Sequence, residues 1–278
     1  MFDTIEVIGN GTLIQHGKQN DRIYLMKLDE KDMPSVLGMM AELAQKNNYS
    51  KIFCKIPGRA FPLFLADRYI LEAIIPGLYN KKEDAFFVSK FPDPGRLQNI
   101  ESVRLSDFSR LLSETSESSK RKASPPEFQS RRLGTADVEQ ITRIYREVFV
   151  SYPFPIHDPG YIIKTMNKHI QYYGAEREGK LVAVASSEID TKGSNAEMTD
   201  FATSKKYLGN SLSVLLLGTM EKEMKKQGIK TLYTIARLNS IPMNKTFLRF
   251  NYTYSGTLVN NTNIAGQIES MNVYYKHL

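Results

Sequence analysis

The sequence contains a single cysteine, Cys54, among its 278 residues. One cysteine excludes an intrachain disulfide and any metal site built from several thiolates. Because Cys54 ends the apolar run Ile52–Cys54, we expect a small buried side chain rather than a nucleophile. The four histidines show no close metal-ligand spacing, so we predict no metal site.

Long apolar segments are also missing. No run approaches the ~18 apolar residues of a membrane-spanning helix, and no apolar signal segment stands at the N-terminus. We therefore expect a soluble, cytoplasmic protein without a membrane partner. Hydrophobic residues make up 41% of the chain and charged residues 24%, as in globular proteins. The length suits one large domain or two ordinary ones.

The charge balance is basic, with a formal net charge of +7 and a pI near 9.2. Such a balance is typical of proteins that bind nucleic acid, a membrane surface or a polyanionic ligand. The basic residues are scattered, however, apart from the run Lys120–Lys122. We expect no nucleic-acid partner and consider a phosphorylated small ligand the better match.

Residues 113–130 divide the chain. This segment, SETSESSKRKASPPEFQS, has no Leu, Ile, Val or Met and is rich in serine, proline and charge. It cannot bury enough apolar surface to order itself, so we interpret it as a linker. It separates an N-terminal unit, residues 1–112, from a C-terminal unit, residues 131–278.

The segment from Asn195 to Gly228 predicts a strand, a glycine-containing turn and a helix. Its helical part repeats apolar residues every three or four positions, at Leu212, Leu215, Leu216, Met220 and Met224. A turn that leads into a helix start leaves backbone N–H groups free around one point, where they can bind an anion such as a pyrophosphate. A plain strand–turn–helix would show the same pattern, because one glycine is weak evidence.

The predicted element order of the C-terminal unit is β-α-α-β-β-β-α-β-α-β-β. With the turn KYLGNS at 206–211, this order resembles the GCN5-related N-acetyltransferase (GNAT) family, whose pyrophosphate loop reads Gln/Arg-x-x-Gly-x-Gly/Ala. Lys206 and Ser211 depart from that pattern. Asn239 and residues 247–252 resemble the family's asparagine and the end of its late helix. The resemblance covers residues 131–278 and implies an α/β fold with a mixed (α+β) sheet.

The two units also resemble each other. Residues 51–56, a helix and residues 68–73 parallel residues 230–235, a helix and residues 251–254. We therefore interpret the N-terminal unit as an α/β domain that resembles a truncated GNAT half. It shows no Gly-x-Gly-like loop, so we predict that it binds no acetyl-CoA. Two unrelated α/β units are the alternative.

The resemblance implies an acetyltransferase that uses acetyl-CoA as co-substrate and a small-molecule amine as acceptor. It assigns the cofactor to the end of the strand, the turn, the helix start and two later positions. These residues are Phe201, Ala202, Thr203, Lys206, Tyr207, Leu208, Gly209, Asn210, Ser211, Leu212, Asn239 and Phe247. Backbone N–H groups near 201–203 would polarise the thioester carbonyl.

Acetyl transfer requires a base, because a primary amine with a pKa of ~10.4 is protonated at neutral pH. In the family this carboxylate lies on the strand before the turn, where this chain has Glu197 and Asp200. Three residues apart in a regular strand, the two would face opposite sides. We assign the base to Glu197, with a solvated carboxylate as the alternative, and contact with the acceptor to Asp200.

The sequence offers more than one candidate for the acid that protonates the leaving thiolate. Many relatives use a tyrosine on the late helix, where this chain has Phe247, which has no proton to give. Water, Tyr252 or Tyr254 are the substitutes, and we name Tyr254 as the catalytic candidate.

The loop Ser151–Ile156 lies where the family forms its acceptor pocket, and we assign Tyr152 and Phe154 to its walls and Glu147 to an ammonium contact. This loop, the truncated N-terminal copy and residues 74–79 resemble the β-lysine N6-acetyltransferases. That resemblance implies acetylation of the N6 amine of β-lysine to the compatible solute Nε-acetyl-β-lysine during salt adaptation.

Other functions stay open. A GNAT enzyme for another small amine, such as a polyamine or lysine, has the same motifs. A catalytically degenerate GNAT pair that only binds would explain Phe247 and the atypical turn, and nucleic-acid binding has only the pI in its favour. A homodimer is one assembly state that we consider.

Overall fold

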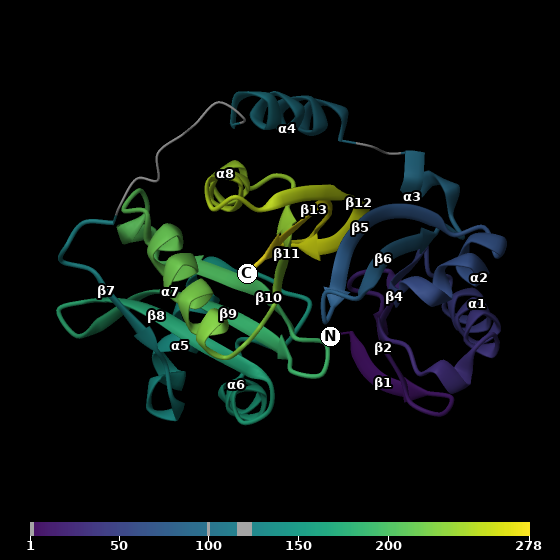
Figure 1. Ribbon diagram of the computed structural model, residues 1–278, viewed down its shortest axis with the longest axis horizontal. Helices are drawn as coiled ribbons and strands as arrows, with labels where there is room; N and C mark the ends of the chain where they lie inside the picture. The colour runs from purple at the N-terminus through teal and green to yellow at the C-terminus, as the bar shows by residue number, and fades with distance from the viewer. Residues whose placement is uncertain (1–2, 99–100, 116–123) are drawn as a thin grey trace.

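The computed structural model describes residues 3–98, 101–115 and 124–278. The N-terminal unit is a six-stranded sheet with two helices on one face (Figure 1). Its strands are β1 (Thr4–Ile8), β2 (Thr12–Gly17), β3 (Arg22–Lys27), β4 (Lys51–Pro57), β5 (Ile70–Tyr79) and β6 (Glu83–Lys90). Its helices are α1 (Ser35–Asn47) and α2 (Phe61–Ala66). The alternation in β4 decides the faces: Ile52 and Cys54 pack with α1 and α2, whereas Phe53 faces the other way. Cys54 is therefore buried, as expected.

The C-terminal unit is a seven-stranded mixed sheet with helices on both faces. Its strands are β7 (Gln129–Arg132), β8 (Ile170–Arg177), β9 (Lys180–Asp190), β10 (Asn195–Thr203), β11 (Thr231–Arg237), β12 (Thr253–Ile264) and β13 (Gln267–His277). Helices α5 (Val138–Val148) and α6 (Pro159–Met166) pack on one face, and α7 (Leu212–Lys226) and α8 (Ile241–Arg249) pack on the other. The predicted order of elements is confirmed.

The two sheets repeat one topology, which confirms the internal similarity read from the sequence. Neighbouring strands follow the order β2-β3-β4-β6-β5 in the N-terminal sheet and the order β9-β10-β11-β13-β12 in the C-terminal sheet. In each unit a parallel strand pair is joined by a helix, α1 or α7, and the next helix, α2 or α8, leads to an antiparallel hairpin. The N-terminal copy has no counterparts of β7, α5 and α6 among its described residues.

The repeated sheets pack face to face. Tyr24, Phe53 and Phe87 of the N-terminal sheet form one buried cluster with Leu258 and Val273 of the C-terminal sheet. This packing covers the half of the C-terminal sheet that α5 and α6 leave open. The N-terminal unit is thus part of the architecture of the C-terminal unit and not an appended module.

The closest approach joins β5 to β12, the same strand in each copy. A Cβ atom at Gly256 would lie 2.0 Å from the backbone oxygen of Glu72, so only glycine permits this contact. Ser255 supports it, because its Oγ accepts from the backbone N–H of Ile74 at 3.0 Å.

Two helices follow the N-terminal sheet that the sequence did not reveal, α3 (Pro94–Gln98) and α4 (Ser102–Thr115). Figure 1 shows α4 above α8, which it contacts, and Phe108 and Leu111 enter the C-terminal core. The expected linker, 113–130, is shorter at both ends. Residues 113–115 continue α4, and Gln129 and Ser130 pair with β8. Residues 116–123, which include Lys120–Lys122, lie outside the described residues.

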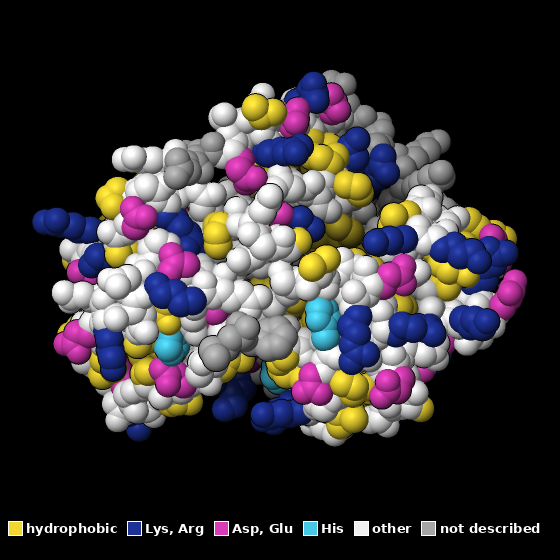
Figure 2. All heavy atoms as spheres, turned by 180° about the vertical axis from the view of Figure 1, so that it is seen from behind, with side chains coloured by type: hydrophobic (Ala, Val, Ile, Leu, Met, Phe, Trp, Pro, Cys, Tyr) yellow, Lys and Arg dark blue, Asp and Glu magenta, His cyan; other side chains and the backbone are white. Residues whose placement is uncertain are grey.

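The surface carries charges of both signs. Figure 2 shows basic and acidic side chains interspersed over both halves of one face of the molecule. Among the described residues, no helix has the length and apolar composition needed to cross a membrane, and no group of three or more His, Cys, Asp or Glu side chains is placed to hold a metal ion.

We predict that the contact between the sheets stabilises the whole chain. Leu258→Ala, at a position with no exposed surface, should lower the free energy of unfolding by about 2–5 kcal/mol because it leaves a cavity between the sheets. Leu65→Ala on α2, where the side chain is 55% exposed, should change it by about 0.5 kcal/mol or less. Urea denaturation followed by circular dichroism measures both, and equal losses would contradict the prediction.

Candidate active site

Three polar side chains form a row across the C-terminal sheet. Glu188 on β9 lies opposite Glu197 on β10, and Tyr233 on β11 lies opposite Glu197 on its other side. Directly paired residues of neighbouring strands point to the same face of a sheet. This face carries α5, α6 and the N-terminal sheet, so the row lines the cavity between the two units.

The two carboxylates of this row influence each other. Burial raises the pKa of Glu197 to about 7, and the negative charge of Glu188 adds to the rise. Burial also opposes ionisation of Glu188, but its ion pair with His169 (Nε2 to Oε1, 3.6 Å) and the charge of Lys55 bring its pKa below the usual value. Glu188 therefore keeps its charge, while Glu197 titrates near neutral pH, where a general base is most effective.

The N-terminal sheet supplies a cation to the row. Lys55 on β4 donates from Nζ to the hydroxyl of Tyr233 at 2.9 Å, and Tyr233 is a hydrogen-bond partner of Glu197. The positive charge of Lys55 lowers the pKa of Glu197 and so acts against Glu188. Residues of both units thus determine the protonation of Glu197.

Asp200 lies on the same face as Glu197, which corrects the expectation that the two point to opposite sides. The pairing of β10 with β9 shifts register between Thr199 and Ala202, and Asp200 adopts a left-handed backbone conformation (φ 56°). This bulge turns the carboxylate of Asp200 toward Ser186, which donates to it at 2.6 Å. The hydroxyl of Tyr152 donates to it as well. Burial raises the pKa of Asp200.

The same bulge separates β10 from β11. Their pairing covers only residues 195–197, so the edge of β10 beyond Glu197 has no partner strand on that side. Phe201, Ala202 and Thr203 lie on this open stretch and line the cavity. Backbone N–H groups on an unpaired edge are available to a ligand.

The turn from β10 to α7 has the backbone of an anion cradle. Gly209 (φ 85°) and Ser211 (φ 56°) are both left-handed, and Ser211 makes no side-chain cap at the start of α7. Such an alternation directs successive N–H groups to one side, next to the positive end of the helix dipole. Tyr207, Leu208, Asn210 and Leu212 line the cavity beside them.

One cavity of about 1530 Å³ contains the cradle, the open edge of β10 and the carboxylate row. It is large enough for two substrates side by side. Its far wall is formed by the N-terminal sheet, which contributes Arg22, Tyr24 and Lys55. The cradle is the observation that fits a pyrophosphate, and the acids fit an amine.

The loop between α5 and α6 closes one end of the cavity, where Tyr152 and Phe154 line it. The N-terminal unit holds this loop in place. Gln15 donates from Nε2 to the backbone oxygen of Pro153 at 2.8 Å, and Gln19 donates to that of Tyr152 at 3.4 Å. This wall of the cavity therefore depends on both units.

Four assigned residues do not line the cavity. Glu147 accepts from the backbone N–H of Lys205 (2.8 Å) and from Ser204, so it caps the turn after β10 instead of meeting an ammonium. Lys206 is exposed beside the turn. Asn239 donates to Glu101 at 3.1 Å, because α4 begins beside it.

The fourth is Tyr254. Its hydroxyl bonds to Thr257 at 2.6 Å, and its ring packs against Phe108 of α4 at 5.0 Å between centroids. It lies on the far side of the sheet and cannot protonate a thiolate in the cavity.

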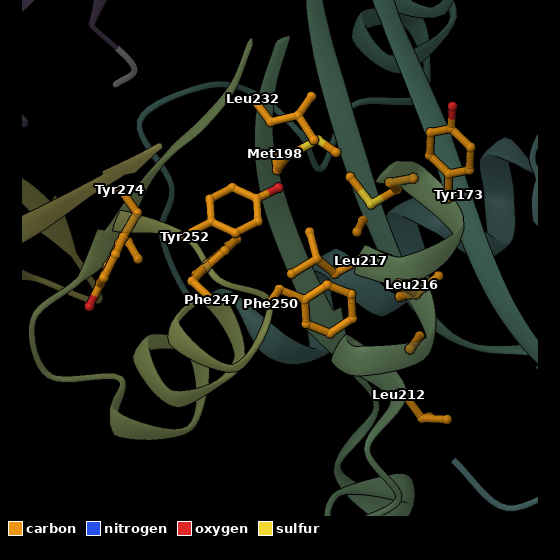
Figure 3. Close-up of a cluster of buried hydrophobic side chains, with 14 of the residues drawn as sticks. Tyr173, Met198, Leu212, Leu216, Leu217, Leu232, Phe247, Phe250, Tyr252 and Tyr274 are labelled. Carbon is orange, nitrogen blue, oxygen red and sulfur yellow. The ribbon is translucent and has the colours of Figure 1, made fainter. Parts of the chain in front are cut away.

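Phe247 lies at the boundary between the cavity and the hydrophobic core. Figure 3 shows it beside Tyr252, with ring centroids 5.3 Å apart, between the strands and α7. It also meets Phe201 edge to face at 5.7 Å. Phe247 lines the cavity with an apolar surface, and its position supports packing instead of acid chemistry.

Sequence reasoning missed Glu188, Tyr233, Lys55 and Arg22. Glu188 could have been found by pairing the strands on either side of the 190–195 connection, which sets it opposite Glu197. Nothing in the sequence places Lys55 or Arg22 near the site, because only the contact between the sheets brings them there.

These features define a GNAT fold with an acetyltransferase-type site, and comparison with known proteins agrees. The acetyltransferase (GNAT) family model matches residues 138–252. The β-lysine N(6)-acetyltransferase of Methanococcus maripaludis is 40% identical over 96% of each chain. N-acetyltransferase YodP of Bacillus subtilis is 30% identical over the full length of both chains. The β-lysine N(6)-acetyltransferase of Methanosarcina mazei is 28% identical over 90% of this chain and 88% of its own. This chain belongs to the GNAT family of acetyltransferases.

We predict that charges from both units set the titration of Glu197. Its carboxyl group should titrate near pH 7, followed by NMR of 13C-labelled glutamate side chains and assigned with Glu197→Gln. Glu188→Gln removes a like charge and should lower the midpoint. Lys55→Met removes an opposite charge and should raise it. Shifts in the same direction, or a midpoint near the usual value, would contradict this arrangement.

Proposed function

We propose that this chain is an acetyl-CoA-dependent N-acetyltransferase that acetylates the N6 amine of β-lysine and forms Nε-acetyl-β-lysine. The observation that carries the proposal is the single cavity in which an anion cradle, an open strand edge and a carboxylate with a pKa near 7 meet. The similarity to a β-lysine N(6)-acetyltransferase along nearly the whole of both chains supports the acceptor.

The residues of the cradle fit the cofactor. The backbone around Gly209 and Ser211 and the start of α7 would hold the pyrophosphate, and the open edge at Phe201–Thr203 would donate to the thioester carbonyl. Acetyl-CoA supplies a thioester whose carbonyl carbon bonds to the amine nitrogen as its bond to sulfur breaks. Phe247 and Phe201 offer an apolar wall beside this edge.

Glu197 is the base in this proposal. Removing a proton from an amine of pKa ~10.4 at pH 7 costs about 4–5 kcal/mol, so the proton must pass to a group on the enzyme as the new bond forms. Ionised Glu197 accepts that proton, and Glu188 and Asp200 hold positive charge at the acceptor. Neither Tyr252 nor Tyr254 lines the cavity, so in this proposal the thiolate takes its proton from water.

The charge of the product fits a compatible solute. At neutral pH β-lysine carries two ammonium groups and one carboxylate, and acetylation of one amine leaves a molecule with no net charge. Such a molecule can accumulate without changing the ionic balance of the cell, which supports a role in salt adaptation. The cytoplasmic location and the homodimer stay predictions, which fractionation of cells and sedimentation of the protein would test.

The acceptor is tested by turnover on a panel of amines. With acetyl-CoA, kcat/KM should be higher for β-lysine than for lysine, spermidine or cadaverine, and mass spectrometry should find the acetyl group on N6. Faster turnover of spermidine would contradict the acceptor. Failure to bind acetyl-CoA would instead favour a degenerate binding module.

Glu197→Gln should lower kcat by about 10²–10⁴-fold and remove the rise in rate through pH 7, because the ionised form is the base. The matched change Glu178→Gln, at an exposed turn, should alter neither.

The anion cradle gives a second prediction. Gly209→Ala places a Cβ in open space but at φ 85°, which costs roughly 1–2 kcal/mol in an L-residue and should reshape the turn. Calorimetry should show CoA binding weakened by about tenfold. Gly228→Ala is the control, since Gly228 has a similar φ of 75°, equally open space and a position at the other end of α7. Equal weakening by both changes would show that the turn does not bind the cofactor.

A further inference from the structure

Arg22 on β3 is a buried cation at the cavity wall. Its side chain is 4% exposed, and it lines the cavity on the side of the N-terminal sheet. Among the described residues it makes no ion pair with an acidic side chain. The carboxylates of Asp3 and Glu72 act on Arg22 only from beyond ion-pair distance. A buried guanidinium that touches no counter-charge is unfavourable, so its presence at a cavity favours an anion that binds there.

The hydrogen bonds of Arg22 leave part of its guanidinium free. Nη1 donates to the backbone oxygen of Asn261 and to Thr262 Oγ1 at 3.1 Å, whereas Nε is buried and has no partner. The guanidinium stacks over Tyr24 and Phe53 at 5.4 and 5.5 Å, which fixes its plane. The group is thus held on one side and unsatisfied on the other.

Arg96 shows what a purely structural arginine looks like at the same contact. It is also buried, but its donors meet the backbone oxygens of Asn260, Asp21 and Asn20 and the hydroxyl of Ser50. It also lies 3.7 Å from Asp21, and it does not line the cavity. Of the two neighbouring buried arginines, only Arg22 faces the site with a donor unpaired.

Tyr24 connects Arg22 to the carboxylate row. The two residues alternate on one face of β3, roughly 7 Å apart along the strand. Burial raises the pKa of Tyr24 most, the charges of Glu197 and Glu188 raise it further, and the charge of Arg22 lowers it, so Tyr24 is near both the acids and the cation. Arg22, Tyr24, Glu188 and Glu197 all line the same cavity, which therefore presents acids and a cation in one space.

We propose that Arg22 binds the carboxylate of the acceptor, so that the N-terminal unit selects amino acids over plain amines. This inference rests on the proposed function, because it assumes that the acceptor amine lies at Glu197. An extended diamino acid carries its reacting ammonium and its carboxylate at opposite ends, which matches the acids and the cation of the cavity. The planar fork of arginine suits a carboxylate, which it can bind through two parallel hydrogen bonds.

The test compares acceptors that differ only by the carboxylate. The first pair is β-lysine and 1,4-diaminopentane, and the second is L-lysine and cadaverine. The wild-type enzyme should favour the acid of its preferred pair by about 10- to 100-fold in kcat/KM, the range expected for buried hydrogen bonds to a charged group. Arg22→Met should abolish that preference and leave kcat/KM for the plain amine nearly unchanged. Arg22→Lys, which keeps the charge but not the fork, should retain part of the preference and serves if the methionine variant does not fold.

Arg96→Met is the matched control. It removes a buried arginine from the same contact and should lower the melting temperature while the acid-to-amine preference stays at the wild-type value. If Arg22→Met reduced the rates for acid and amine by the same factor, or if the wild-type enzyme showed no preference, the proposal would be overturned. Faster turnover of lysine than of β-lysine, with a preference for lysine over cadaverine that Arg22→Met abolishes, would refute the proposed acceptor and still support Arg22 as its carboxylate site. Acceptance of carboxylate-free amines alone would refute both.

Discussion

The structure depends on the hydrogen bonds that the N-terminal sheet makes to the backbone of an irregular stretch of β12. The pairing of β12 with β13 shifts register between Leu258 and Thr262, which frees backbone groups in the interior. The buried pair of Lys51 and Glu72 binds both backbone groups of Val259, with Lys51 donating to its oxygen and Glu72 accepting from its N–H, each at 2.7 Å. Arg96 and Arg22 donate to the next two carbonyls. Unpaired polar backbone groups in this buried position would be costly. The irregular stretch of β12 therefore needs its partners in the N-terminal sheet, and the buried charged side chains of that sheet need these backbone groups.

This contact gives the two copies of one topology different tasks. In the C-terminal copy the turn before α7 contains Gly209 and an uncapped helix start, which suit an anion. The corresponding N-terminal turn, residues 28–34, has no glycine, and its Asp32 accepts hydrogen bonds from Thr12 and Asn10. Those bonds hold the pKa of Asp32 at about 2, so the turn carries fixed negative charge that repels phosphate. The N-terminal copy instead contributes its open sheet face to the acceptor wall.

The carboxylate row illustrates how function departs from what stability favours. Like charges directly opposite each other on neighbouring strands are destabilising. Here burial, together with the repulsion between Glu188 and Glu197, raises the pKa of Glu197 into the range where a carboxylate accepts protons effectively at neutral pH. Lys55 reaches the row from the other unit and limits that shift. The contact between the sheets therefore both completes the cavity and adjusts the chemistry within it.

The local features of this protein follow from its amino-acid sequence. Apolar periodicity and turn residues predicted the strands, the helices and the turn around Gly209, because each depends on neighbours along the chain. The choice of Glu197 came from the resemblance to the GNAT family. The remaining features depend on contacts between segments that are distant in the sequence. A register shift in β10 turned Asp200 to the face of Glu197. Phe108 of α4 packs against Tyr254, and Glu101, just before α4, accepts a hydrogen bond from Asn239. Lys55 and Arg22 are far from Glu197 in sequence, and they reach its cavity because two sheets pack face to face, which no local pattern encodes.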